Sequence, residues 1–161
     1  TGHLVVTTLH TNSSTEAITR LMDMGVEPFL LSAAVRAFLA QRLVRRLCQT
    51  CRRPVTLTDQ DKQELGMPLE LEGTPYEAVG CDHCRNTGFS GRLAIYEIVL
   101  LTLPMQELIA HGAPASEVKA LAIKEGYEPM REYGWAKVME GDTTIEEVIS
   151  VTSSDLGGGE E

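Results

Sequence analysis

The sequence predicts a mixed α/β fold, and three observations support that prediction. Runs of strand composition occupy residues 4–9, 41–47 and 93–101. Apolar residues at helical spacing lie between these runs and after the last one. The composition, 43% hydrophobic and 23% charged over 161 residues, is that of a globular protein with room for one ordinary domain or two small ones. No apolar run approaches the roughly 18 residues of a membrane span.

The first run, LVVTTL at residues 4–9, has no polar alternation, which is typical of a strand buried on both faces of a parallel sheet. His3 and His10 flank this run seven residues apart, and an odd separation places two side chains on opposite faces of a strand. A histidine at the carboxyl end of a parallel strand lies where open α/β sheets bind ligands. From spacing alone, the simpler interpretation is that two polar residues cap the strand.

Two helices are expected after this strand. Ser13 and Glu16 have capping-box spacing, and Gly25 is placed to end the helix that they begin. A proline suits the first position of a second helix, over 28–40. This second helix is apolar around most of its circumference and has Arg36 as its only charge, so we expect it to be buried within a larger assembly.

The rest of the chain is predicted to form further short strands and helices. The segment 41–47 is expected to be a strand with Leu43 and Leu47 on one side. Thr143 and Glu146 have capping-box spacing at the start of the last helix. The other predicted elements are a helix over 58–65, a strand over 93–101 and helices over 105–111, 116–124 and 143–151.

All four cysteines occur in two C-x-x-C pairs, CQTC at 48–51 and CDHC at 81–84. The two thiolates of one such turn can face a single metal ion, and two turns complete a tetrahedron of sulfur around zinc. The interval between the pairs exceeds that of an ordinary zinc ribbon, but the closure entropy of the inner loop grows only with the logarithm of its length. The pattern predicts a closed, structural zinc site with these ligands: Cys48, Cys51, Cys81 and Cys84.

Two other interpretations of the cysteines differ in their chemistry. Disulfide bonds need an oxidising compartment, and nothing in the sequence indicates export, because no basic segment followed by an apolar core begins the chain. Thiol–disulfide exchange would favour one C-x-x-C near a helix start rather than two matched pairs. His83, inside the second pair, is expected to be an exposed neighbour because four sulfurs already fill the coordination shell.

The charge distribution bears on nucleic-acid binding. A formal net charge of −9 argues against general affinity for nucleic acid. Five arginines nevertheless lie within twelve positions: Arg42, Arg45, Arg46, Arg52 and Arg53. Such a cluster is usually a solvated face, and no aromatic residue is interleaved with it for base stacking. The alternative function is therefore a stand-alone zinc-ribbon module that binds nucleic acid or an acidic protein partner.

Several segments of the chain match one known family when they are taken together. TGHLVVTTLHTN resembles a histidine box, and RLMDMGVEPFLL, LAQRLVRRLCQTC and TGFSGRLAIYEIV continue the similarity. Weaker similarity extends to TTIEEVISVT, so the resemblance covers most of the chain. The family is that of the ATPases that drive type II secretion and type IV pilus assembly. Pilus retraction ATPases generally lack the four cysteines, which disfavours that branch.

The resemblance implies a fold and a setting that the residues alone do not establish. It implies the C-terminal part of a RecA-like nucleotide-binding domain, with an inserted tetracysteine zinc subdomain and a C-terminal helical subdomain. It also implies a cytoplasmic homo-hexamer at the inner face of the cytoplasmic membrane, which uses ATP and Mg²⁺ and acts with inner-membrane platform proteins. The corresponding divisions are 1–47 for the RecA-like core, 48–92 for the zinc subdomain, 93–152 for a returning strand and the helical subdomain, and 153–161 for a disordered tail.

By the same resemblance, the histidine box lies near the terminal phosphate of the nucleotide. The residues expected near the nucleotide are His3, Thr8, His10, Thr11 and Arg92. Histidine can donate a hydrogen bond to developing negative charge, and the planar fork of an arginine can grip phosphate oxygens. Without the resemblance, Arg92 is simply a surface residue beside a glycine turn.

The motifs that would bind the phosphates and magnesium do not occur in this sequence. It contains no G-x-x-x-x-G-K-[ST], and the acidic segment that would hold magnesium and orient water is also absent. In the family both lie before the histidine box. We therefore expect this chain to be part of a longer ATPase, to contain no catalytic residue of its own and to hydrolyse no ATP when isolated.

Overall fold

The computed structural model describes residues 2–11 and 13–152, so the predicted tail at 153–161 lies outside the described residues. The chain divides into two compact units. Unit 1 comprises 1–40 and 98–127, and unit 2 comprises 41–97 and 128–161. The predicted zinc subdomain falls within unit 2, while the predicted functional divisions of the chain remain predictions.

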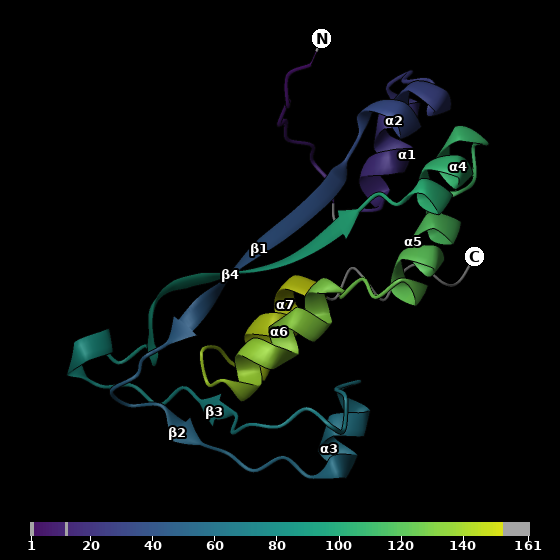
Figure 1. Cartoon of the computed structure of the whole chain (residues 1–161). Helices are drawn as coiled ribbons and strands as arrows, with labels where there is room; N and C mark the ends of the chain where they lie inside the picture. The colour runs from purple at the N-terminus through teal and green to yellow at the C-terminus, as the bar shows by residue number, and fades with distance from the viewer. Residues whose placement is uncertain (1, 12, 153–161) are drawn as a thin grey trace. The chain divides into compact units, whose positions relative to one another are not determined.

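The longest strands, β1 (Ala37–Leu47) and β4 (Phe89–Leu100), form a two-stranded sheet (Figure 1), and each strand has residues assigned to both units. They run antiparallel. The backbone N–H of Leu101 donates to the carbonyl of Arg36 at one end of the pair, and the N–H of Cys48 donates to the carbonyl of Gly88 at the other. The end of β1 and the start of β4 therefore lie side by side. The first cysteine pair follows the end of β1, and the second cysteine pair precedes the start of β4.

Unit 1 is built from helices around one apolar core. Its helices are α1 (Glu16–Asp23), α2 (Pro28–Ala34), α4 (Leu103–Ala110) and α5 (Ala115–Lys124). Its fully buried side chains include Ile18 from α1, Ile109 from α4 and Val118 from α5. The helices predicted at 105–111 and 116–124 are confirmed as α4 and α5, with their starts shifted by one or two residues.

The predicted buried strand at 4–9 is wrong. Residues 2–11 form no regular secondary structure, and Leu4, Val5 and Val6 are 85%, 79% and 86% exposed. A strand buried on both faces needs hydrogen-bonding neighbours along both edges. In the described part of the chain the two long strands pair only with each other. The argument that placed two histidines on opposite faces of this strand therefore does not apply.

The predicted helix over 28–40 is too long. It ends at Ala34, because Val35 is already extended, with φ −76° and ψ 136°. Alternate burial then begins at Ala37, so the apolar run changes from helical to strand periodicity within the predicted helix. Of the helix itself, Leu31 is buried but Phe29 and Leu30 are 59% and 52% exposed. Within this chain the helix is covered on one side only.

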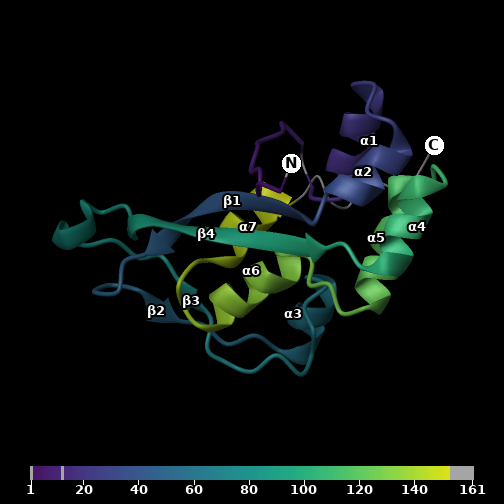
Figure 2. The same ribbon diagram turned by 45° about the horizontal axis from the view of Figure 1, so that its top comes forward.

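Unit 2 contains the small elements and a helical hairpin. Its elements besides the long strands are β2 (Arg53–Pro54), α3 (Asp59–Glu64), β3 (Tyr76–Glu77), the 3₁₀ turn η1 (Asp82–Cys84), α6 (Met130–Met139) and α7 (Ile145–Thr152). The helices α6 and α7 lie side by side in both ribbon views (Figures 1 and 2). Between them they bury Trp135, Val138 and Val148 completely. Helix α6 was not predicted, because Gly134 interrupts its helical pattern.

Two local predictions in unit 2 are wrong by one residue position. Leu43 and Leu47 do not share a side: Leu43 is 54% exposed and Leu47 is buried, because consecutive exposed arginines shift the alternation of β1. The cap of α7 is Thr144, whose hydroxyl accepts from the N–H of Glu147, and not Thr143. The predicted strand over 93–101 and the helices over 58–65 and 143–151 are confirmed within a few residues.

Candidate metal centre

The two C-x-x-C turns bring their four sulfur atoms together in unit 2. Cys48 follows β1, Cys51 lies just before β2, Cys81 directly precedes the η1 turn and Cys84 ends it. All four Sγ atoms lie within 4.8 Å of one another. Among the described residues, this is the one group of three or more cysteine, histidine or carboxylate side chains close enough to share a metal ion.

The spacing of the sulfur atoms fits zinc. The Sγ–Sγ distances are 3.9 Å for Cys48–Cys81, 3.8 Å for Cys51–Cys84 and 3.8 Å for Cys81–Cys84. A tetrahedron with zinc–sulfur bonds of about 2.3 Å has edges of about 3.8 Å. The cysteines are therefore arranged as four thiolate ligands of one tetrahedral ion require, and none of them is in a disulfide.

Backbone donors surround these sulfurs. The N–H of Gly80 donates to Cys51 Sγ at 3.3 Å, and those of Cys81 and Gly88 donate to Cys84 Sγ at 3.2 Å each. Gly88 has φ +77°, and a Cβ at this position would lie 2.6 Å from that of Ala78. Only glycine fits here, so the turn after the second pair is shaped to present a backbone N–H to the sulfur.

The protonation of the cluster also favours a cation. Burial raises the pKa of Cys84, but hydrogen bonds from the N–H groups of Cys81 and Gly88, together with those to the Cys51 and Cys81 thiols, lower that pKa to about 6. Burial raises the pKa of Cys51 to about 11. Neighbouring thiolates repel one another, so all four ionise together only when a positive charge balances them. His83 is exposed within η1, as predicted, and is not one of the clustered side chains.

None of the residues predicted near a nucleotide belongs to the cysteine cluster. His3, Thr8 and His10 are exposed in unit 1, and Thr11 is half-buried and donates its hydroxyl to the carbonyl of Ser13 at 3.1 Å. Arg92 is exposed on β4 in unit 2. Their role at a nucleotide stays a prediction.

The arginine cluster serves the packing of unit 2. Three of its members form ion pairs: Arg45–Glu147 at 2.6 Å, Arg46–Asp142 at 3.5 Å and Arg53–Glu77 at 2.5 Å. A fourth, Arg52, lies over the ring of Tyr76 and donates to the carbonyl of Gly141. Sequence reasoning missed these partners because the acidic residues of the first two pairs lie 102 and 96 positions further along the chain. Nothing local signals such a pairing.

The fold and the site define a class: a mixed α/β chain with a cluster of four cysteines that could hold a metal ion. The model of the family described as type II/IV secretion system protein matches residues 1–150. The chain belongs to that family.

Individual relatives agree with this assignment. The chain is 44% identical over 158 residues to the type IV pilus assembly ATPase PilB of Myxococcus xanthus, an alignment that covers 96% of this chain and 28% of the relative. It is 44% identical over 155 residues to the type II secretion system protein E of Aeromonas hydrophila, covering 96% of this chain and 31% of the relative. With the PilB of Thermus thermophilus it shares 44% identity over 154 residues, which is 94% of this chain and 17% of that protein.

The chain therefore spans less than a third of the length of these three curated relatives. None of the helices in the described part of the chain has the length and apolar character needed to span a bilayer.

Proposed function

We propose that this chain is the C-terminal portion of a hexameric, RecA-like ATPase that powers type II protein secretion or type IV pilus assembly. The observation that carries the proposal is the 44% identity across nearly the whole chain to relatives named as pilus assembly ATPase and as secretion protein E. In this proposal the intact protein is cytoplasmic, lies at the inner face of the cytoplasmic membrane and acts with inner-membrane platform proteins. It uses ATP with Mg²⁺ bound by segments outside this sequence.

In the same proposal this chain supplies groups that bind the nucleotide but do not cleave it. His10 and His3 would donate hydrogen bonds to the terminal phosphate, with Thr8 and Thr11 as hydroxyl donors and Arg92 as a fixed positive charge. The exposure of His10 and Arg92 supports this role, because both side chains are free of the protein interior and open to a ligand. The pairing of Arg45, Arg46 and Arg53 with carboxylates disfavours the alternative of a nucleic-acid module.

Two measurements test this proposal. The coding DNA before the codon for Thr1 is sequenced first: an in-frame P-loop and acidic segment support the motor, and a start codon directly before Thr1 overturns it. ATP turnover is then measured on the protein that contains the P-loop, with His10→Ala against His83→Ala, an exposed histidine outside the histidine box. We expect ATP turnover to be lost in His10→Ala and kept in His83→Ala. If the two variants turn over ATP at the same rate, His10 has no role at the nucleotide site.

We further propose that the four cysteines hold a structural Zn²⁺. The tetrahedral spacing of the sulfurs and the backbone donors around them support this proposal. Bound zinc would cross-link the two C-x-x-C turns, with no open position for a reacting ligand. Elemental analysis of protein purified under reducing conditions is expected to find about one zinc per chain and almost none in Cys84→Ser. A metal-free wild-type protein with intact thiols would overturn the assignment.

A further inference from the structure

The first cysteine pair is tied to the turn between α6 and α7 by a dense set of contacts. We call the contacts between 45–52 and 141–147 the clasp; both segments belong to unit 2. The clasp surrounds the first C-x-x-C pair on both sides, since one half of it precedes Cys48 and the other half follows Cys51.

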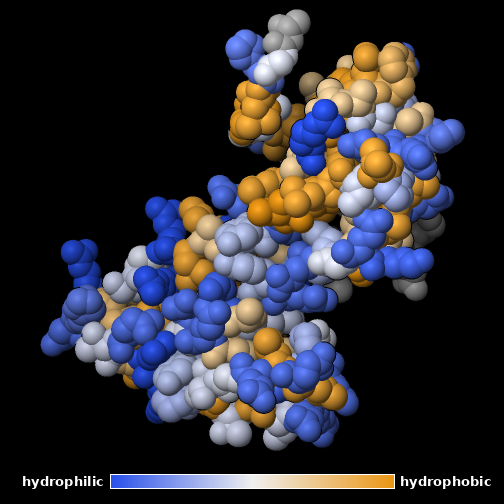
Figure 3. Space-filling model, viewed as in Figure 1, coloured by the Kyte–Doolittle hydropathy of each residue, from blue (hydrophilic) through white to orange (hydrophobic). Residues whose placement is uncertain are grey.

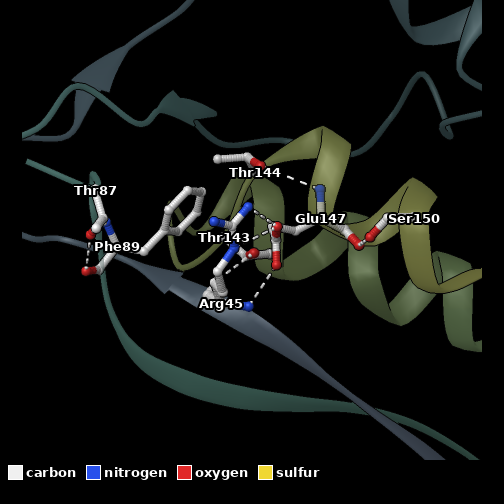
Figure 4. Close-up of polar contacts among 7 residues, drawn as sticks. All are labelled: Arg45, Thr87, Phe89, Thr143, Thr144, Glu147 and Ser150. Carbon is white, nitrogen blue, oxygen red and sulfur yellow. Dashed lines mark hydrogen bonds and ion pairs between the residues drawn. The ribbon is translucent and has the colours of Figure 1, made fainter.

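The half before Cys48 centres on Arg45 and Glu147 (Figure 4). The Glu147 carboxylate accepts from Arg45 three times, from its backbone N–H at 2.8 Å and from its guanidinium at 2.9 and 2.6 Å. The hydroxyl of Thr143 donates to the carbonyl of Arg45 at 2.8 Å. The Arg45 guanidinium also lies 4.0 Å from the centre of the ring of Phe89, the first residue of β4. One residue of β1 is thus held at its N–H, its carbonyl and its side chain.

The clasp continues through and beyond the cysteines. The N–H of Leu47, directly before Cys48, donates to the carbonyl of Asp142 at 2.8 Å. After Cys51, Arg52 donates to the carbonyl of Gly141 at 2.5 Å and lies over Tyr76. Gly141 has φ +76°, and a Cβ there would lie 2.5 Å from the Arg52 guanidinium. The turn after α6 is therefore fitted to the residue that follows the first pair.

We propose that metal binding at the tetracysteine centre and docking of the α6–α7 hairpin are coupled through the clasp, with Glu147 as a positioning residue for Cys48. The proposal rests on the proposed zinc site. Groups outside the ligand shell that fix the ligands typically change metal affinity by about 10- to 100-fold when they are removed. Coupling between two binding events is reciprocal, so zinc that is held better by a docked hairpin must also hold the hairpin better.

The experiment compares three variants of the full chain loaded with zinc. Glu147→Gln removes the charge at the centre of the clasp. Glu146→Gln removes an exposed charge from the neighbouring position of the same helix, and Thr152→Val disturbs the buried end of that helix outside the clasp. Zinc affinity is measured by competition with a chromogenic chelator, and amide exchange of 130–152 is measured with and without zinc.

The expected result is about a tenfold loss of zinc affinity in Glu147→Gln and little change in the two controls. Zinc is expected to slow amide exchange of the hairpin in the wild type and to slow it less in Glu147→Gln. Equal zinc affinity in all three variants, or hairpin exchange that zinc does not alter, would overturn the coupling while leaving the zinc site intact. A wild-type protein that binds no zinc would instead refute the site itself, and the coupling with it.

Discussion

The two units of this chain are stabilised by different kinds of interaction. Unit 1 has an apolar core of nine buried side chains, yet eleven further large hydrophobic side chains are exposed on it. Among its described residues, unit 2 exposes four such side chains, and it contains the cysteine centre and all four ion pairs for which the structure gives distances. On the face presented in Figure 3, hydrophobic side chains gather over the elements of unit 1. The side chains that unit 2 shows on this face are mostly polar.

This difference indicates where each unit obtains its stability. Unit 2 has a smaller apolar cluster that includes Trp135, Val138 and Val148, and it adds the ion pairs and the cysteine cluster, so it has the features of a self-contained unit. Unit 1 leaves apolar surface open, as expected of a surface that packs against other protein. In a chain proposed to be part of a longer ATPase, that surface is where we expect further burial. The first two predictions below change one unit and ask whether the other responds, and the last two measure smaller contributions within unit 2.

Removing zinc is expected to have the largest effect, and to act on unit 2. Structural zinc sites contribute apparent free energies of about 10–16 kcal/mol in small peptides. Chelation, or Cys84→Ser, should therefore expose the amides of α6 and α7 to exchange while α4 and α5 remain protected. Equal loss of protection in both sets of helices would show that the two units share a single folding transition.

Truncating the core of unit 1 should have the next largest effect. Ile109 is fully buried, and Ile109→Ala is expected to cost about 2–5 kcal/mol. Trp135 is the one tryptophan of the chain and lies buried in unit 2, so its fluorescence reports on that unit. Urea unfolding of the variant should show an earlier transition by circular dichroism and an unchanged midpoint by fluorescence. A shift of both signals together would contradict independent units.

Enlarging Gly134 should weaken unit 2 by a smaller amount. A Cβ at this position would lie 2.6 Å from Val148 Cγ1, where α6 crosses α7. We expect Gly134→Ala to cost about 1–3 kcal/mol through overpacking. Because the clash is with one side chain, Gly134→Ala combined with Val148→Ala should cost less than the sum of the two single changes. Unfolding is followed by fluorescence. If the free-energy costs of the two single changes simply add in the double variant, α6 and α7 pack less tightly at Gly134 than the 2.6 Å distance implies.

The smallest expected effect is a pH dependence at the start of α3. The hydroxyl and then the backbone N–H of Thr58 lower the pKa of Asp61, with which Thr58 forms a capping box. A carboxylate whose pKa is lower in the folded state stabilises the fold above its ordinary pKa, about 3.9, and this contribution fades as the pH falls through the folded value. Asp61→Asn should therefore reduce the thermal midpoint slightly at pH 6, and the deficit should shrink toward pH 3.

The matched control for this effect is Asp59→Asn, which removes an acidic residue of the same first turn that is not part of the capping box. It is expected to show a smaller deficit at pH 6. Equal deficits in the two variants would mean that helix-terminus charge, and not the capping box, stabilises α3.

The cysteine cluster could be predicted from sequence because its information is local. Two C-x-x-C turns specify sulfur pairs without reference to the rest of the fold. The Arg45–Glu147 contact has no such signal, since its partners lie 102 positions apart and each is an ordinary surface residue type. Long-range pairing follows from topology, which the local pattern does not contain.

The failures share a second cause, which is dependence on neighbours. The apolar run at 4–9 has strand composition, but composition describes the environment that a segment needs and not the one that it has. Helix α6 is the opposite case, because a helix forms where none was predicted. Gly134 weakens the helical pattern in the sequence, while the close approach of Val148 requires that glycine. Tertiary packing determines the outcome in both cases.

The shifted alternation of β1 limits how this protein can vary in length over evolutionary time. Val44 and Leu47 are both buried although they are an odd number of residues apart in the strand. This is possible because Arg45 and Arg46, which lie between them, are exposed in succession. Deleting either arginine would shorten the segment between Val44 and Leu47 by one residue, and so shift Leu47 and Cys48 against the carbonyls of Asp142 and Gly88 to which their N–H groups donate. The irregular segment over 68–75, by contrast, can gain or lose residues at little entropic cost. Homologous genes should therefore carry insertions in that segment and none between Val44 and Cys48.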